Sequence, residues 1–338
     1  MAEGGRAPEP AAGPLPSRRA ARAASRRGWR RGARPTGRAG RWKRLTAKQR
    51  TIARAVEVRG YGIHTGEPSV VRLRPAPEHG GLRFRRTDLP GAPEIPATVE
   101  SVHSAHRETA LRKGEAVVRT AEHVLAAAHG LALDNLWIDV SGPEPPALDG
   151  SAAAWCDRLL DAGPVAQEAE APSLRIDRPL HLNIGGTKYD VLPAETGRIS
   201  ATIDFDHPLI GRQSASARLE PVEFAREVAP ARTFGLSAWA EALRERGLAL
   251  GATRENTLVL SGDGLEAGQE LRFPDEFVRH KILDIIGDLA LVGARLQCHV
   301  VAERPGHRGN LELARRLAAA RATAQGRGSK ENEMNEEG

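Results

Sequence analysis

Apolar residues recur along residues 51–322 with the spacings of strands and helices, in an order that repeats. Helical spacing predicts helices at about 121–130, 151–162, 237–246, 275–294 and 309–324. Alternating or short continuous apolar runs predict strands, of which the clearest are TIARAVEV, PSVVRLRPA, NLWIDV, SLRID, ISATIDFD, TLVLSGD and LQCHVVAE. The polar, proline-flanked stretch PVAQEAEAPS divides these elements into two similar series, and we interpret it as a linker. The pattern predicts an α+β fold of two domains, residues 47–168 and 169–322.

The helix predicted at 275–294 carries three polar side chains that its apolar pattern does not explain. His280, Asp284 and Asp288 lie four residues apart, so each advances only about 40° around the helix. A histidine and an aspartate at this spacing can bind one metal ion from consecutive turns, although an exposed ion pair is the ordinary alternative. Another side of the helix has the apolar stripe of a core-facing element: Val278, Ile282, Ile286 and Leu289.

Gly287 interrupts the same helix, between the direction of His280 and that of the apolar stripe. A glycine inside a helix is less favourable than alanine by about 1 kcal/mol, so its presence needs a reason. The missing side chain would leave room beside the histidine for a ligand or for another backbone. Close helix packing explains the glycine equally well.

A second group of polar residues begins the helix that is predicted to follow Thr120, its candidate cap. Glu122 and His123 lie in the first turn, where the helix dipole favours an ionised carboxylate. If His123 joined His280 and Asp284, two imidazoles and one carboxylate would make up the ligand set of a catalytic zinc site. Glu122 would then be the neighbouring base.

Other histidines lie in predicted loops. In ERPGHRGN, His307 follows a strand and is flanked by glycines, which suits either a surface histidine or a proton donor near neutral pH. Asp288 could orient that imidazole and favour its protonated form. His103 and His106 of SVHSAHRET are interpreted as solvated loop residues.

The stretch PARTFGL places Thr233 and Phe234 ahead of a predicted helix with a narrow apolar stripe. Leu236 and Ala240 belong to this stripe. One interpretation is ordinary core packing. The other is an apolar channel for an alkyl chain.

Positive charge is concentrated at the N-terminus of this 338-residue chain. The formal net charge is +6, and residues 1–50 hold 15 arginines and lysines against Glu3 and Glu9, so the rest of the chain is acidic. Residues 1–46 are too poor in apolar side chains to fold, and we expect disorder there and in the polar tail 323–338. Three interpretations of the extension stay open. It is a solvated addition or the result of a misassigned start codon, a segment that binds acidic membranes or nucleic acid, or an organelle transit peptide.

The chain lacks the sequence features of membrane-spanning and secreted proteins. No run approaches the roughly 18 apolar residues that a membrane span needs, and no apolar segment follows the basic start as in a secretory signal. Cys156 and Cys298 are far apart and belong to no CxxC motif, which indicates buried thiols in a reducing compartment. We therefore expect a soluble protein.

Seven stretches together, in this order along about residues 48–322, resemble one family. They are GYGIHTG, TAEHVLAAAHGLALDN, PEPPALDGSAAAW, TIDFDHP, ARTFG, DEFVRHKILDIIGDLALVG and PGHRGN. The family is UDP-3-O-acyl-N-acetylglucosamine deacetylase, the zinc amidase that commits Gram-negative bacteria to lipid A synthesis by releasing acetate. The resemblance implies two similar α+β domains, each a sheet layered with helices, with the active site in the cleft between them. We expect a cytoplasmic monomer without an obligate protein partner, with acidic surfaces as contacts of residues 1–46.

The resemblance also implies roles for individual residues. One Zn²⁺ would be bound by His123, His280 and Asp284. It would polarise the amide carbonyl while Glu122 takes the proton of the attacking water. Zinc and Thr233 would hold the oxyanion. His307, oriented by Asp288, would stabilise charge or protonate the amine, and the division of this acid role between His307 and Glu122 stays open. The substrate-binding residues would be Lys281 at a phosphate, Phe205 against the nucleotide, and Phe234, Leu236 and Ala240 along the acyl chain.

Two alternatives stay open at this point. A metal amidase could act on another acylated amino sugar, because ligands specify chemistry better than they specify the substrate. A protein of a different class could bind nucleic acid or an acidic surface through its Arg-rich extension and carry only a vestigial site.

Overall fold

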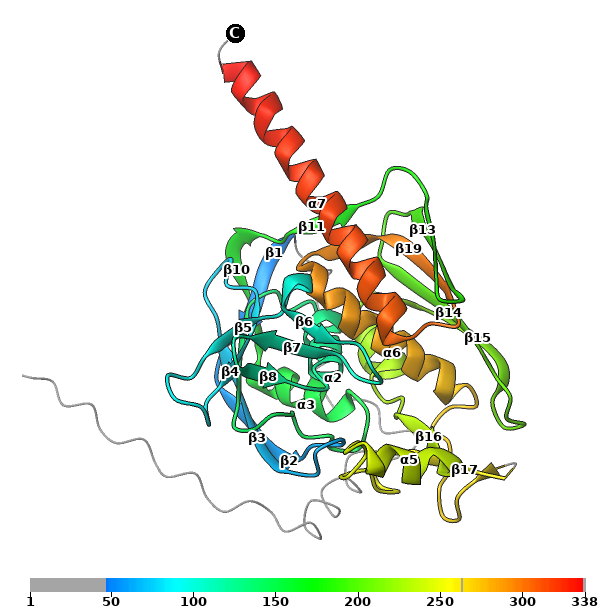
Figure 1. Cartoon of the computed structure of the whole chain (residues 1–338). Coiled ribbons are helices and arrows are strands. Elements are labelled where there is room, and N and C mark those ends of the chain that lie inside the picture. Colours follow the sequence, from blue (N-terminus) through cyan, green and yellow to red (C-terminus); the bar gives the residue numbers. More distant parts are fainter. Residues whose placement is uncertain (1–46, 263, 337–338) are drawn as a thin grey trace, which may run out of the picture.

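The first domain is built on a five-stranded sheet. The computed structural model describes residues 47–262 and 264–336 (Figure 1). The strands, in their order across the sheet, are β2 (Val56–Tyr61), β3 (Pro68–Pro75), β9 (Leu136–Val140), β4 (Leu82–Arg86) and β5 (Glu94–Pro96). Along β3, Val71 and Leu73 are fully buried whereas Arg72 between them is exposed. This period of two is that of a sheet with one covered face.

The second domain has a six-stranded sheet of closely similar design. Its main path runs through β12 (Leu180–Ile184), β13 (Thr187–Pro193), β19 (Arg295–Glu303), β14 (Arg198–Phe205) and β15 (Gly211–Arg218). The short strand β11 (Ser173–Arg175) pairs with β19 in parallel.

The two sheets share one topology. The central strand β9 is antiparallel to β3 and parallel to β4, and β19 is likewise antiparallel to β13 and parallel to β14. One helix leads into each central strand, α2 (Glu122–Gly130) into β9 and α6 (Glu276–Leu289) into β19. Another helix follows each central strand, α3 (Ala153–Ala162) and α7 (His307–Glu336). The predicted fold of two similar α+β domains is confirmed.

Each domain carries a small sheet inserted between its last outer strand and its crossover helix. In the first domain this insertion consists of β6 (Val102–Ser104), β7 (Ala110–Lys113) and β8 (Ala116–Val118). In the second it consists of β16 (Phe234–Leu236), β17 (Leu258–Ser261) and β18 (Gly264–Leu265), with η4 (Ser237–Trp239) and α5 (Ala240–Glu245) between β16 and β17.

The helices α2 and α6 pack against each other between the two sheets (Figure 1). In α6 the predicted apolar stripe is buried, and so is the face that carries His280, Asp284 and Asp288. Only Arg279 and Lys281 of this helix are not buried. The helix is therefore covered by its own domain on one side and by the first domain on the other.

Two ion pairs join the domains away from this helix pair. Arg295 at the start of β19 lies 2.6 Å from Asp134, which follows α2. Arg272 of the second domain lies 2.9 Å from Asp149 of the first. All four side chains are at most 17% exposed, so water screens these charges less than it would at the surface. Removing either partner would leave a buried charge unpaired, so these pairs favour one fixed arrangement of the domains.

Two local predictions are wrong. The stretch expected to be a linker forms β10 (Pro164–Glu170), which pairs antiparallel with β1 (Lys48–Ile52). The stretch is polar because much of β10 is exposed. Thr120 does not cap α2: the N-cap is Ala121, and Thr120 lies at φ +47° with its hydroxyl donating to Glu144 at 2.7 Å.

The last helix is longer than predicted. The sequence indicated an end near 324, whereas α7 runs from His307 to Glu336. Its first turns bury Leu311, Leu313 and Leu317. Within residues 47–262 and 264–336, neither α7 nor another helix has an apolar stretch that could span a bilayer. The basic extension 1–46 lies outside the described residues.

The crossing of α2 and α6 explains Gly287. A Cβ at this position would lie 2.1 Å from the carbonyl oxygen of Glu122 and 2.8 Å from its carbonyl carbon. A Cβ cannot approach an oxygen or a carbon atom so closely, so the glycine is required by the approach of the α2 backbone. Of the explanations open from the sequence, the structure selects close packing against another backbone.

Replacing Gly287 with alanine should therefore separate the two helices. Alanine raises intrinsic helix propensity by about 1 kcal/mol, yet overpacking should lower the free energy of unfolding by about 1–3 kcal/mol. Urea denaturation measures this change. Gly264→Ala is the control, because a Cβ there meets nothing within 4 Å. Equal or greater stability of the Gly287 variant would contradict the role given to this contact.

Candidate metal centre and active site

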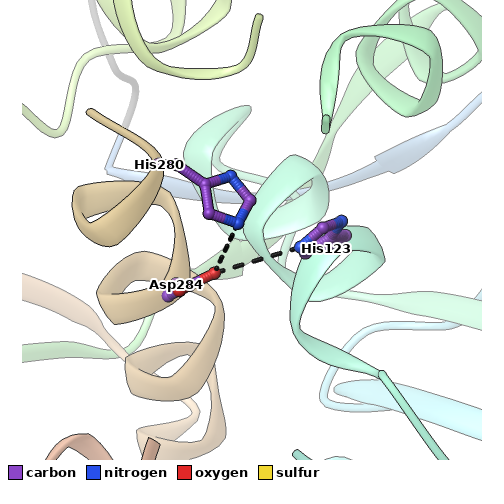
Figure 2. Close-up of side chains that lie close together, drawn as sticks. All are labelled: His123, His280 and Asp284. Carbon is purple, nitrogen blue, oxygen red and sulfur yellow. Dashed lines mark ion pairs between the residues drawn. The ribbon is translucent and has the colours of Figure 1, made fainter. Parts of the chain in front are cut away.

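Three side chains from the two domains meet at the crossing of α2 and α6 (Figure 2). His123 comes from the first turn of α2, and His280 and Asp284 come from consecutive turns of α6. One ligand atom from each lies within 4.8 Å of the other two. Asp284 Oδ1 is 3.4 Å from His280 Nε2 and 3.9 Å from His123 Nε2. The three side chains predicted as a metal set are therefore adjacent in space.

The donor set and its orientation fit a divalent metal ion. Two imidazole nitrogens and one carboxylate oxygen are the composition of catalytic zinc sites. The Nδ1 of His280 lies 3.0 Å from the backbone carbonyl oxygen of Ala231, and a proton on Nδ1 leaves Nε2 directed at the centre. The side chains of His123, His280 and Asp284 are 12%, 3% and 4% exposed, so the centre is largely shielded from water.

The surroundings also favour the protonation states that a metal ion requires. Burial lowers the pKa of His123 to about 3, and the neighbouring His280 adds to this shift. Burial likewise lowers the pKa of His280. Burial by itself would raise the pKa of Asp284, but Lys281 and the histidines lower it overall. Two neutral imidazoles and an ionised carboxylate result, without a proton to displace on metal binding.

A second polar cluster lies beside these three residues. The ring of His307, at the start of α7, is 2.9 Å from Asp288 through Nδ1 and 3.9 Å from Glu122 Oε1 through Nε2. Asp288 is one turn after Asp284 on α6, and Glu122 precedes His123 on α2. The cluster and the metal set therefore share the same two helices.

The acid and the base of this cluster have pKa values far from their ordinary ones. Burial raises the pKa of the Glu122 carboxyl to about 8, although the nearby His307 opposes the shift. Burial by itself would lower the pKa of His307, but Asp288 raises it to about 10 through its charge and its hydrogen bond. Between these values Glu122 is a carboxylate, which can accept a proton, and His307 is an imidazolium, which can donate one.

Several supporting residues were not identified from the sequence. The Thr109 amide donates to Glu122 at 2.9 Å and its hydroxyl donates to Asp288 at 2.5 Å. Asn310 donates to Asp288 at 2.8 Å and accepts from the Tyr189 hydroxyl at 2.6 Å. Asn310 lies within PGHRGN, three residues after His307, so helical spacing could have indicated it. Thr109 and Tyr189 gave no signal, because tertiary folding alone brings them here.

Two of the predicted substrate-binding residues, Phe234 and Lys281, adjoin the metal set, and Phe205 packs against Phe234. The Phe234 ring is 6.3 Å from the His280 ring and packs edge-on against Phe205 at 5.6 Å. The Lys281 ammonium lies over Phe234, 5.6 Å from the ring centre, and pairs with Asp284 at 2.8 Å. Lys281 is thus engaged by a metal-set carboxylate, which the sequence did not indicate.

The remaining predicted residues continue along the same chain segment. Thr233 precedes Phe234, and its amide donates to the Gly150 carbonyl of the first domain at 2.8 Å. Leu236 and Ala240 are half-buried, so they are neither core residues nor freely exposed. His103 and His106 are exposed, as the sequence predicted.

Comparisons with known proteins identify the family of this chain. The family model described as UDP-3-O-acyl N-acetylglycosamine deacetylase matches residues 49–319, which include every site residue named above. Proteins named UDP-3-O-acyl-N-acetylglucosamine deacetylase are similar over most of their length. That of Thermosynechococcus vestitus is 43% identical over 82% of this chain and 96% of its own. The protein of Nostoc sp. is 42% identical over 80% of this chain and 99% of its own. The protein of Bdellovibrio bacteriovorus is 39% identical over 80% of this chain and 89% of its own. The chain belongs to the UDP-3-O-acyl N-acetylglycosamine deacetylase family.

Proposed function

We propose that this chain hydrolyses the N-acetyl group of UDP-3-O-acyl-N-acetylglucosamine, releasing acetate and the free amine, the committed step of lipid A synthesis. The observation that carries the proposal is the convergence of His123, His280 and Asp284 with Glu122 and His307 at one helix crossing. Membership of the deacetylase family supports the substrate.

The resident metal is proposed to be a single Zn²⁺ held by His123, His280 and Asp284. The nitrogen-rich donor set suits zinc better than magnesium or calcium, which prefer oxygen ligands. When bound, zinc supplies a Lewis acid that polarises the acetamide carbonyl and makes water more acidic. The centre lies beside Glu122 and His307, so this assistance would act where the proton transfers occur.

Glu122 and His307 divide the proton transfers. Glu122 as the carboxylate takes a proton from the attacking water, whose oxygen forms the new bond to the carbonyl carbon. The C–N bond then breaks, and the amine leaves with a proton from the His307 imidazolium or from the Glu122 carboxyl. Asp288 acts as a positioning residue that keeps His307 protonated. The carboxylate of Asp288 also accepts hydrogen bonds from Thr109 and Asn310.

Substrate binding is proposed on the side of Phe234. The Thr233 hydroxyl would stabilise the oxyanion, and Lys281 would meet a phosphate once it exchanges its contact with Asp284. Phe205 would pack against the nucleotide. Phe234, Leu236 and Ala240 would line the path of the acyl chain.

The domain limits, the cellular location and the oligomeric state are part of the proposal. The domains would span 47–168 and 169–322, and the chain would act as a cytoplasmic monomer without an obligate protein partner. The free, buried state of Cys156 and Cys298 suits a reducing compartment.

A substrate panel tests the proposed function. The purified zinc-loaded protein should release acetate from UDP-3-O-acyl-N-acetylglucosamine and should spare acylated amino sugars without the UDP group. Hydrolysis of another amide while the UDP-linked sugar is spared would assign the metal site to a different substrate.

Two substitutions should separate metal binding from proton transfer. His280→Ala removes a ligand, so the purified variant should lack zinc by elemental analysis and release no measurable acetate. Glu122→Gln keeps all three ligands and should retain zinc, while its turnover falls by about 10²–10⁴-fold because the base is missing. The control is the exposed His103→Ala. Unchanged turnover in either site variant would contradict the role assigned to that residue.

The pH dependence of kcat/KM should reflect the protonation of Glu122 and of His307, which is paired with Asp288. A plot of kcat/KM against pH should rise as Glu122 loses its proton and fall as His307 loses its proton. Asp288→Asn removes the charge that raises the pKa of His307, so the alkaline limb should move to lower pH by roughly 1 unit or more. An alkaline limb that stays in place would show that His307 is not the group titrating there.

The basic extension should be dispensable for catalysis. Deleting residues 1–46 should change kcat by less than about twofold, because the site lies within the folded domains. Binding of the full chain to nucleic acid or acidic vesicles, if it occurs, should be sensitive to salt and absent from the shortened chain. A large loss of turnover on deletion would give the extension a part in the reaction.

A further inference from the structure

The motif GYGIHTG forms a rigid loop between β2 and β3 that has no part in the chemistry above. Buried Glu144 holds this loop from within, since its carboxylate accepts the amides of His64 at 3.0 Å and Thr65 at 2.8 Å. A Cβ at Gly62 would lie 2.3 Å from this carboxylate, so the loop closes tightly around it. His64 therefore projects from a fixed backbone.

His64 contacts the second domain through a run of hydrogen bonds. Its Nδ1 accepts the amide of Ala249 at 3.2 Å, and its carbonyl accepts the amide of Leu250 at 3.0 Å. One residue earlier, the carbonyl of Ile63 accepts the amide of Gly251 at 3.0 Å. The approach is so close that a Cβ at Gly251 would lie 2.0 Å from the carbonyl oxygen of Gly62.

These contacts hold one end of a segment in which Leu248 is buried but whose middle is not anchored in the core. The 234–251 segment begins at Phe234 beside His280, passes through η4 and α5, and ends at the His64 loop. Neither η4 nor α5 has a buried residue. Burial of apolar surface therefore does little to fix the position of η4 and α5, and polar and ring contacts, including those at the His64 loop, contribute more to it.

A second contact links the same segment to the first domain. The Arg107 guanidinium lies over the ring of Trp239 in η4, 4.8 Å from the ring centre. The backbone of Arg107 also interacts with the imidazole of His64. Burial lowers the pKa of His64, which keeps Nδ1 able to accept the Ala249 amide. The imidazole of His64 thus lies between Arg107 of the first domain and Ala249 of the second.

We propose that His64 is a positioning residue that fastens the 234–251 segment to the first domain and thereby fixes the wall along which the substrate's acyl chain binds. The identity of the acyl chain rests on the proposed function, whereas the fastening itself does not. Loosening the segment should weaken binding of a long chain and leave the bond-breaking step largely unchanged.

Two variants separate the hydrogen bond from the bulk of the ring. His64→Phe keeps a ring and removes the acceptor of the Ala249 amide. His64→Asn places its side-chain oxygen where Nδ1 was and should restore that bond. His103→Asn, on an exposed residue of β6, is the matched control.

Hydrogen exchange tests the fastening without any substrate. In His64→Phe the amides of 237–251 should exchange about tenfold faster or more, and His64→Asn should recover most of the protection. Exchange that does not change in His64→Phe would overturn the proposal. If that variant does not fold, Ala249, Leu250 and Gly251 of the unaltered protein must still be protected, and rapid exchange of these amides would overturn it.

Kinetics on zinc-loaded protein tests the consequence for substrate. In His64→Phe the KM for UDP-3-O-acyl-N-acetylglucosamine with a long saturated chain should rise about tenfold, with kcat within about twofold and zinc content unchanged. The KM for the 3-O-acetyl analogue should stay the same. Equal increases for both substrates would overturn the acyl-wall role. Absence of turnover in the unaltered protein would instead count against the proposed function, since the exchange measurement does not depend on it.

Discussion

The site depends on direct contact between the backbones of two helices from different domains. Gly287 of α6 lies against the carbonyl of Glu122 of α2, with no space for a single additional carbon atom. This contact fixes the distance between His123, next to Glu122 on α2, and the two α6 residues His280 and Asp284, which lie one to two turns before Gly287. The buried ion pairs of Arg295 and Arg272 with first-domain aspartates keep the domains from shifting away from this contact. The proposed metal site needs such a constraint, because His123 belongs to one domain and His280 and Asp284 to the other.

Burial acts on every ionisable group at this crossing, yet the groups end in different protonation states. His123 and His280 stay neutral, because burial outweighs the attraction of Asp284. His307 is charged, because Asp288 lies 2.9 Å away and accepts further bonds from Thr109 and Asn310 that stabilise it as a carboxylate. The position of each carboxylate thus decides which imidazoles can bind a metal and which can donate a proton. The two carboxylates concerned, Asp284 and Asp288, lie one turn apart on α6.

Much of this could be predicted from the sequence where the signal is local. The four-residue spacing of His280, Asp284 and Asp288 predicted that they share one face of a helix. The patterns of strands and helices predicted the two α+β domains. Contacts across the domains left no local signal, so Thr109 and Tyr189 were missed and the pairing of Lys281 with Asp284 was not foreseen. The polar strand β10 was taken for a linker, because pairing with β1 decides its structure and apolar content does not. The family resemblance, rather than spacing, joined His123 to the ligands on α6.

The most direct test of the account is a crystal structure of the zinc-loaded protein with anomalous data collected on both sides of the zinc absorption edge. We expect one strong anomalous peak per chain, within about 2.0–2.2 Å of Nε2 of His123, Nε2 of His280 and a carboxylate oxygen of Asp284. A peak bound by other residues would contradict the proposed metal site. So would a structure in which His123 lies too far from the two α6 side chains to share one ion with them.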